Sequence, residues 1–427
     1  MKHVIDECKT LLIDGPASVS ILSGKVNVLG APLQISEKLV IREGKRLPLW
    51  VRKRATLELK LGEGASINEV DTGPVPSSWD GAAKEILSMG KPLTIMVLGG
   101  IDSGKTSFCT FLVNEAVMKK WRTSVIDADL GQSDVGPPST VGSNFVTELV
   151  KDLFEIDAQD AVFVGSTSPS GAINKVIEGL IQLKDKVIEA GVDFLVINTD
   201  GWVEGEEAVD YKIRLAEKAV SSAVVGIQRG NELFPILDAL HGVKVIVIDS
   251  PQMIQPRNRE KRKVLRELSY KKYLKGAKMQ SFSLSWIKVI DSILGAGGPL
   301  HHRRLETLSN LLGTRPIYSE ETVASILVVL KKNEAVTEEQ IIDAEEHFGK
   351  RIKVIREGDE EGLLVGLKDE EDIFLGIGIL HEVDYKRKIL KIYTSVSEKV
   401  SMLYFGQIKM DKNFREIGLN TIYSKEL

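Results

Sequence analysis

The sequence predicts an α/β protein in which a parallel sheet flanked by helices lies between two small β-rich domains. Continuous apolar runs of buried-strand length recur between residues 93 and 249, and amphipathic helical stretches separate most of them. Residues 17–70 instead alternate apolar and polar positions in short runs broken by glycines, which is typical of antiparallel strands. From about residue 317 the pattern is mixed again, with strand-like runs and one helix-like stretch.

Each predicted element follows from one of these patterns. Residues 72–80 are rich in turn formers and are predicted to form a linker. A helix is expected at 338–348, with strands at 373–377 and 389–393. The predicted domains are 1–75, 76–315 and 316–427. In the central domain the predicted strands are 93–98, 123–128, 161–164, 192–198, 222–227 and 244–249, and the predicted helices are 104–120, 171–190 and 206–220.

Composition limits the classes of protein that fit. The 427 residues, 43% hydrophobic and 27% charged, predict a globular protein of two or three domains. A formal charge of −4 supplies no overall attraction to a polyanion, so a nucleic-acid site requires a local cluster of Lys and Arg. Only Cys8 and Cys109 are present, and no stretch approaches the roughly 18 uncharged apolar residues of a membrane span. We therefore expect a cytoplasmic protein without a membrane partner.

The strongest motif is G-x4-G-K-[ST] at residues 99–106, between a predicted strand and a predicted helix. This context predicts a P-loop NTPase core, because backbone N–H groups of the loop and the helix N-terminus bind phosphate oxygens. Lys105 is expected to reach the β- and γ-phosphates of ATP, and Thr106 to ligate Mg²⁺. The predicted ATP-binding residues are Gly99, Gly100, Ile101, Asp102, Ser103, Gly104, Lys105, Thr106 and Ser107.

A pair of carboxylates follows the next predicted strand, at Asp127 and Asp129. Ligands of open α/β sheets bind at the carboxyl ends of the strands, which is also where the phosphate-binding loop lies. Asp129 is therefore predicted to hold hydrated Mg²⁺ or to take a proton from an incoming hydroxyl group. Asp127 is the alternative metal ligand, or a cap of a turn.

Two nucleotide-binding classes fit less well. A GTPase would carry Asn-Lys-x-Asp after a later strand, whereas this strand ends in Asn198-Thr199-Asp200-Gly201-Trp202. The phosphate-binding loop also lacks the additional early lysine of dimeric ATPases that position partner proteins, because Ile101 follows Gly100.

The motifs, taken in order, resemble those of the polynucleotide 5′-hydroxyl kinases related to the eukaryotic pre-mRNA cleavage-factor kinase and the ribosomal-RNA-processing kinase, in an archaeal-type form. The resemblance covers residues 93–275 most strongly. It rests on the phosphate-binding loop, the Asp-x-Asp-x-Gly-Gln segment ending at Gln132, Thr-Ser-Pro at 167–169, Thr-x-Gly-Trp at 199–202, and an Arg-rich segment at 257–266.

The resemblance implies an ATP-dependent kinase that phosphorylates 5′-hydroxyl ends of RNA, with DNA as a further candidate, in RNA processing or repair. It assigns Lys105 and Asp129 to catalysis, and Thr199 and Trp202 to a clasp on the phosphates and the terminal nucleotide. An indole can stack on any base, although a Trp202 that fills the core is the alternative. The predicted substrate-binding residues are Gln132, Thr167, Ser168, Thr199, Gly201, Trp202, Arg257 and Arg259.

The family also has a lid whose arginines cover the transferring phosphoryl group, and residues 251–278 are its expected position here. Arg262 and Arg266 lie four residues apart on a predicted helix and are the favoured catalytic arginines, while a solvated charged helix is the alternative. Two other functions stay open at this point. One is an ATP-binding scaffold without catalysis in an RNA-processing complex, and the other is a kinase of free nucleosides or nucleotides.

Overall fold

The computed structural model describes residues 1–254, 256–292 and 294–419, which form two compact units. The first unit comprises residues 1–162 and 168–266, and the second comprises 163–167 and 267–427. The predicted domain boundaries at residues 75 and 315 stay a prediction. Residue 255 of the predicted lid and residues 420–427 of the predicted C-terminal domain lie outside the described residues.

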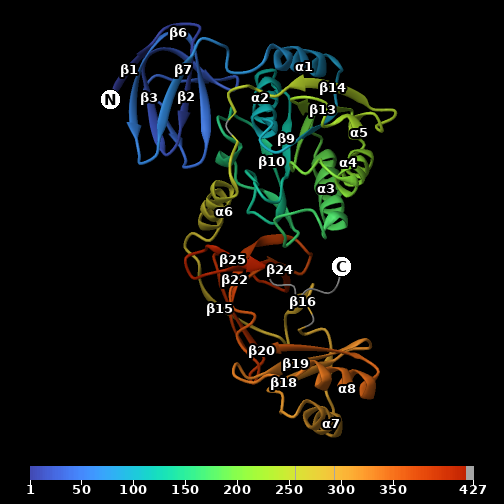
Figure 1. The fold of residues 1–427 in the computed structure, drawn as a ribbon. Helices are drawn as coiled ribbons and strands as arrows, with labels where there is room; N and C mark the ends of the chain where they lie inside the picture. Colours follow the sequence, from blue (N-terminus) through green and yellow to red (C-terminus); the bar gives the residue numbers. More distant parts are fainter. Residues whose placement is uncertain (255, 293, 420–427) are drawn as a thin grey trace. The chain divides into compact units, whose positions relative to one another are not determined.

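The first unit begins with a seven-stranded antiparallel sheet of order β4-β3-β6-β2-β7, in which β1 also pairs with β6 and β5 with β3 (Figure 1). Alternate residues from Ala17 to Ile21 are buried, as the period of a half-buried strand requires. The strands are β1 (Lys2–Ile5), β2 (Thr10–Asp14), β3 (Ala17–Val28), β4 (Ala31–Leu33), β5 (Lys38–Ile41), β6 (Arg46–Leu61) and β7 (Ser66–Val70).

The central sheet has the order β11-β10-β9-β12-β8-β13-β14, and the five strands from β9 to β14 in this order are parallel. Every residue of β8, β9 and β12 is buried, as expected for strands covered on both faces. The strands are β8 (Leu93–Gly99), β9 (Thr123–Ala128), β10 (Thr140–Val146), β11 (Asp160–Phe163), β12 (Phe194–Thr199), β13 (Ala223–Gln228) and β14 (Lys244–Asp249).

Helices cover both faces of this sheet, with α1 and α2 on one face and α3, α4 and α5 on the other (Figure 1). Trp79, on α1, packs edge-on against Phe108 of α2 with ring centroids 5.1 Å apart, which joins the two helices of the first face. The helices are α1 (Ser77–Ser88), α2 (Lys105–Met118), α3 (Ile173–Glu189), α4 (Glu206–Ala219), α5 (Phe234–Leu237) and α6 (Arg259–Tyr273), with a 3-10 turn η1 at Leu153–Glu155.

The predicted fold class is confirmed, with two local corrections. Strand β10 pairs antiparallel with β9 and was not predicted, because Gly142, Ser143 and Asn144 interrupt its apolar pattern. The predicted linker at 72–80 is wrong from residue 77 onward, where α1 begins directly after Pro76. The buried face of α1 contains Trp79, Ala82, Ala83, Ile86 and Leu87, spaced as on one side of a helix.

The second unit contains two sheets, of order β15-β23-β22-β21-β24-β16 and β17-β18-β19-β20, with β25 paired to β24. The edge strands β15 and β16 are separated by only residues 284–287, so the larger sheet curls back on itself. Its elements are β15 (Lys278–Ser283), β16 (Lys288–Ile290), β17 (Gly298–Pro299), α7 (His302–Leu312), β18 (Tyr318–Glu321), β19 (Ser325–Leu330), α8 (Glu338–Phe348), β20 (Arg351–Arg356), β21 (Leu363–Lys368), β22 (Phe374–Asp384), β23 (Ile389–Thr394), β24 (Met402–Met410) and β25 (Glu416–Leu419).

A buried charge network joins the N-terminal sheet to the central sheet within the first unit. In the turn between β5 and β6, Lys45 Nζ lies 3.2 Å from Asp134 Oδ2 and 2.8 Å from Asp152 Oδ1. Arg42 bonds Asp134 as well, and its guanidinium lies 3.8 Å from the ring centroid of Phe154. Burial alone would raise the pKa of Asp134, but Lys45 and Arg42 hold it well below the usual value.

We expect Asp134→Asn to lower the free energy of unfolding by about 3–5 kcal/mol, because it leaves two buried cations with one carboxylate fewer. Asp6→Asn in the exposed Arg54–Asp6 pair is the matched control and should cost at most about 1 kcal/mol. Urea unfolding of the full chain measures both variants. Equal effects of the two substitutions would contradict the structural role of the network.

The same network predicts how the difference in unfolding free energy between the wild type and Asp134→Asn depends on pH. A carboxylate with a depressed pKa stabilises the folded state above the unfolded pKa of about 3.9, and this contribution is lost as the pH falls through the folded pKa. The stability difference between the wild type and Asp134→Asn should thus be constant from pH 7 to about pH 5 and shrink below pH 4. Urea unfolding at four pH values from 3 to 7 measures it.

Candidate active site

The phosphate-binding loop connects β8 to α2 and needs its glycines for close backbone contacts. A Cβ on Gly99 would lie 2.4 Å from Ser103 Oγ, and Gly104 has a left-handed φ of +102°. The hydroxyl of Ser103 is buried and has no hydrogen-bond partner within the described residues. An unpaired buried donor in a loop of exposed backbone N–H groups fits a phosphate ligand. The residues present therefore suit a nucleotide.

Lys105 lies at the first turn of α2 and is almost fully buried. Its Nζ donates to the carbonyl oxygens of Gly99 and Gly100 at 2.9 and 2.8 Å. Burial lowers the pKa of Lys105, while the charge of Asp129 opposes that change. The ammonium group therefore lies inside the loop and near the acidic segment, as a phosphate-binding lysine requires.

Asp127 organises the acidic segment through both of its oxygens. Oδ2 accepts the backbone N–H groups of Asp134 and Val135 at 2.7 and 3.3 Å, and Oδ1 accepts Asn198 Nδ2 at 2.9 Å. Asn198 Nδ2 also lies 3.4 Å from Thr106 Oγ1. Burial and the neighbouring Asp129 raise the pKa of Asp127 to about 7. Asp127 thus anchors the loop, which agrees with the cap alternative.

Asp129 is half-buried and more available for chemistry. Its Oδ1 accepts the N–H groups of Gly131 and Gln132 at 3.2 and 2.9 Å, and its Oδ2 has no hydrogen bond within the described residues. Burial raises the pKa of Asp129, and Lys105 opposes this shift. Among the described residues no group of three His, Cys, Asp or Glu could hold a metal ion. A divalent ion at a P-loop typically takes few protein ligands besides phosphate oxygens and water, so Thr106 and Asp129 fit such an ion.

The segment 199–202 lies directly against the phosphate-binding loop. A Cβ on Gly201 would lie 2.9 Å from the backbone N of Ile101, so only glycine permits this approach. Trp202 is half-buried and stacks on Tyr211 of α4, with centroids 5.9 Å apart. Thr199 is fully buried, and its hydroxyl donates to Val97 O at 2.8 Å. The roles of Thr199 and Trp202 in a clasp stay predictions.

The predicted lid segment contacts the phosphate-binding loop and the acidic loop. The carboxylate of Asp102 accepts the backbone N–H of Arg257 at 2.8 Å and lies 3.7 Å from the guanidinium of Arg262. Gln132 Nε2 donates to the Arg262 carbonyl at 3.1 Å. Arg262 Nε and Gln132 Oε1 are buried without hydrogen-bond partners within the described chain. The lid backbone thus approaches the phosphate-binding loop.

The remaining site residues predicted from the sequence lie less closely together. Ser107 is half-buried on the first turn of α2, and Arg259 is exposed at the start of α6. Arg266 is half-buried one helical turn after Arg262. Thr167 belongs to the second compact unit and Ser168 to the first, in the loop after β11.

Three residues near the site were not singled out from sequence. Lys212 is fully buried and pairs with Asp200 at 2.7 Å, and a lysine on the apolar face of the 206–220 helix was a usable signal. Asn198 connects Thr106 to Asp127 and ends a buried strand. Arg229 donates to Asp102 O at 2.7 Å, and no sequence pattern marked it.

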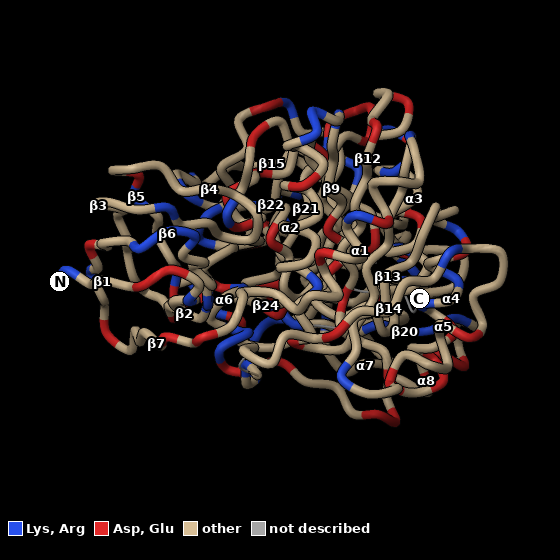
Figure 2. The backbone as a smooth tube through the Cα atoms, turned by 90° about the horizontal axis from the view of Figure 1, so that it is seen from above, with Lys and Arg blue, Asp and Glu red and all other residues tan. Residues whose placement is uncertain are grey.

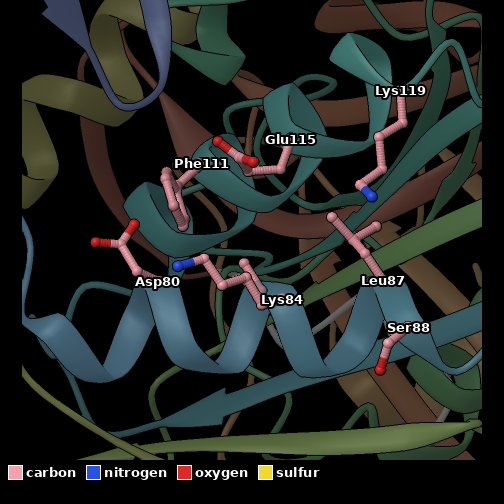
Figure 3. A pocket seen from close by; sticks show the side chains of 8 residues that line it. Asp80, Lys84, Leu87, Ser88, Phe111, Glu115 and Lys119 are labelled. Atoms are coloured by element: carbon pink, nitrogen blue, oxygen red, sulfur yellow. The ribbon is translucent and has the colours of Figure 1, made fainter.

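Charge and cavities add two observations. Lys/Arg and Asp/Glu are interspersed along most of the backbone in Figure 2. A small pocket lies between α1 and the C-terminal half of α2, where Lys84 and Asp80 face Phe111 and Glu115 (Figure 3). None of its lining residues belongs to the phosphate-binding loop.

In the described part of the chain, no helix is long and apolar enough to cross a membrane.

Comparison with known proteins agrees with this geometry. The family described as mRNA cleavage and polyadenylation factor CLP1 P-loop matches residues 99–276. The chain is 29% identical to a polyribonucleotide 5′-hydroxyl-kinase of Methanocaldococcus jannaschii, over 82% of this chain and 95% of the relative. It is 28% identical to the enzyme of the same name from Pyrococcus furiosus, over 82% and 96%.

A solved structure shows the same fold. The structure of the wild-type Clp1p–Pcf11p complex superposes with a TM-score of 0.67 and 12% identity, covering 96% of this chain and 97% of that chain. The chain is also 25% identical to a CLP1 homologue of Nematostella vectensis over 67% of its length and 72% of the relative. A phosphate-binding loop, an acidic segment and an Arg-rich lid occur here in the order that the resemblance requires, and residues 99–276 of the chain are similar to the CLP1 P-loop family.

Proposed function

We propose that this chain is an ATP-dependent polynucleotide kinase that transfers the γ-phosphate of ATP to the 5′-hydroxyl end of RNA. The observation that carries the proposal is the convergence of two segments, residues 199–202 and the predicted lid, on Ile101 and Asp102 of the phosphate-binding loop. Gly201 packs against Ile101, and Arg257 and Arg262 reach Asp102. The names of the relatives from M. jannaschii and P. furiosus support RNA as the acceptor.

The residues suit in-line phosphoryl transfer, in which positioning and charge neutralisation provide most of the catalysis. ATP supplies the phosphoryl group, and Mg²⁺ is the divalent ion that we propose to neutralise its charge. Lys105 and the backbone N–H groups of residues 99–106 bind phosphates, and Arg262, which lies 3.7 Å from Asp102 of the same loop, helps to neutralise the transferring group. Asp129 is the residue that we propose to ligate the ion or to accept the proton of the 5′-hydroxyl group, and a raised pKa supports the second role.

A scaffold without catalysis is not favoured, because Lys105, Asp129 and the contacts of the lid are all present. A kinase of free nucleosides would need neither the Arg-rich α6 nor the tryptophan at position 202. DNA ends are a further proposed substrate, since discrimination would rest on contacts with a 2′-hydroxyl group. A role in RNA processing or repair and a cytoplasmic location are part of the same proposal.

The test uses the purified chain with Mg²⁺, γ-labelled ATP and oligonucleotides of one sequence. RNA and DNA are each supplied with a 5′-hydroxyl or a 5′-phosphate end, together with a free nucleoside. We expect label only on 5′-hydroxyl polymers. Label on the nucleoside alone, or no transfer despite nucleotide binding, would overturn the proposal in favour of a small-molecule kinase or a scaffold.

Lys105→Met should lower the rate of transfer by about 10²–10³-fold, as loss of a charged donor to a transferring group does. Lys119→Met is the matched control, because Lys119 is exposed just after the other end of α2. Asp129→Asn should cause a loss of comparable size, since an amide cannot accept the proton and brings no negative charge to the ion. Circular dichroism confirms folding, and full activity of either variant would remove that residue from the mechanism.

Arginines in the first turns of α6 provide an internal comparison. Arg262→Met should reduce the turnover rate by about 10³-fold or more if its guanidinium neutralises the transferring group. Arg259→Met should change turnover by less than about threefold, because Arg259 is exposed and forms no hydrogen bond or ion pair with the loop among the described residues, and surface substitutions are usually mild. Single-turnover rates with saturating ATP measure both. Equal effects of the two substitutions on turnover would indicate that α6 serves only as a general basic surface.

A further inference from the structure

Lys212 is a fully buried lysine with no role in the mechanism described so far. It lies on the apolar face of α4, with Ala208, Tyr211, Leu215 and Ala216 also buried. Its Nζ donates to Asp200 Oδ2 at 2.7 Å and to the Asp200 carbonyl at 3.0 Å. Both acceptors belong to the segment that carries Trp202.

Asp200 transmits this contact to Trp202 in two ways. Its Oδ1 accepts the backbone N–H of Trp202 at 2.9 Å. Its Oδ2 also accepts the hydroxyl of Tyr211 at 2.9 Å, and the Tyr211 ring is the surface on which the Trp202 indole stacks, with an interplanar angle of 30°. The Asp200 carboxylate therefore holds both the backbone N–H of Trp202 and the Tyr211 ring on which the Trp202 indole stacks. Lys212 binds the same carboxylate, at the oxygen that also accepts the Tyr211 hydroxyl.

Little space is available for this segment to shift. Gly201 touches the backbone of Ile101, and Gly100 lies near Val203. Tyr211 and Lys212 are fully buried, and Asp200 is 5% exposed. A displacement of Asp200 would consequently move Trp202 relative to the phosphate-binding loop, where small changes in position reduce the transfer rate strongly.

Energetic considerations favour a positioning role over a stabilising one. A buried ion pair contributes little net stability, because the desolvation of both charges offsets their attraction, and apolar residues of similar volume commonly serve better. Burial lowers the pKa of Lys212, and Asp200 opposes this shift. The ammonium also affects the active centre, since its charge lowers the pKa of Lys105 and opposes the rise in the pKa of Asp129.

We propose that Lys212 is a positioning residue for the acceptor RNA, which holds Trp202 in place through Asp200 and Tyr211. The inference rests on the proposed kinase function and adds to it a residue that sets the affinity for the 5′-terminal nucleotide. ATP binding, which depends on residues 99–106, should not require it.

The experiment compares Lys212→Met with Lys218→Met, an exposed lysine on the same helix. KM for a 5′-hydroxyl oligoribonucleotide should rise about tenfold in Lys212→Met, the size expected for a weakened base stack, while KM for ATP changes less than about twofold. Lys218→Met should match the wild type in both. Trp202→Phe, measured in parallel, should show the same selective rise in KM for RNA.

A double variant separates position from stability. Lys212→Met leaves the Asp200 carboxylate buried without its cation, whereas Asp200→Asn/Lys212→Met removes both charges. We expect the double variant to recover the melting temperature of the wild type and to keep the raised KM for RNA. Recovery of both quantities would overturn the proposal and make the pair a structural contact only.

Other outcomes are equally decisive. Unchanged KM for RNA in Lys212→Met, or equal rises in both KM values, would overturn the positioning role. A wild-type chain that binds the oligoribonucleotide without phosphorylating it would refute the proposed function alone. In that case the dissociation constants of the same variants, from quenching of tryptophan fluorescence by the RNA, decide the role of Lys212.

Discussion

The carboxylate of Asp127 is the interaction on which the arrangement of the site depends. One oxygen holds the backbone of Asp134 and Val135, and the other holds Asn198, which in turn reaches Thr106. The acidic loop, the phosphate-binding loop and strand β12 are thereby fixed to one buried group. A group without solvent access that accepts several hydrogen bonds sets positions rigidly, because each unmade bond would leave a buried polar atom unsatisfied.

The N-terminal sheet extends this constraint from outside the central sheet. Asp134, whose N–H is bound by Asp127, presents its own carboxylate to Arg42 and Lys45. Arg46 in β6 donates to the Met253 carbonyl at 2.9 Å, which connects the same sheet to the predicted lid. The N-terminal residues therefore support both loops that face the phosphate-binding loop, and this explains why a β-rich region accompanies the nucleotide-binding core.

Around the phosphate-binding loop, side chains of opposite charge lie next to one another. Asp102 attracts Arg257 and Arg262, Lys105 lies near Asp129, and Lys212 pairs with Asp200. In each of these three sets a cation and a carboxylate lie close together, which limits the cost of desolvation. A phosphate anion entering among these groups would meet cations already held near it by carboxylates, and such preorganisation is the main source of electrostatic catalysis.

The sequence alone determined the parallel core and the phosphate-binding loop, because each depends on contiguous residues whose geometry is local. Continuous apolar runs predicted β8, β9 and β12, whereas the polar strand β10 was missed, since pairing with β9 and not its own hydrophobicity forms it. Helix α1 was not predicted, because Pro76 and the two serines that follow it are typical of a linker.

Only the tertiary structure decided which charged side chains meet. Arg257 lies 155 positions from Asp102, and Arg42 lies 92 from Asp134, so no periodicity could pair them. The link from Lys212 through Asp200 to Trp202 was hidden for a different reason. Its residues are close in the chain, but the sequence does not show what Lys212 binds on the apolar face of its helix. Only the folded chain brings the Asp200 carboxylate within hydrogen-bonding distance of this buried ammonium group.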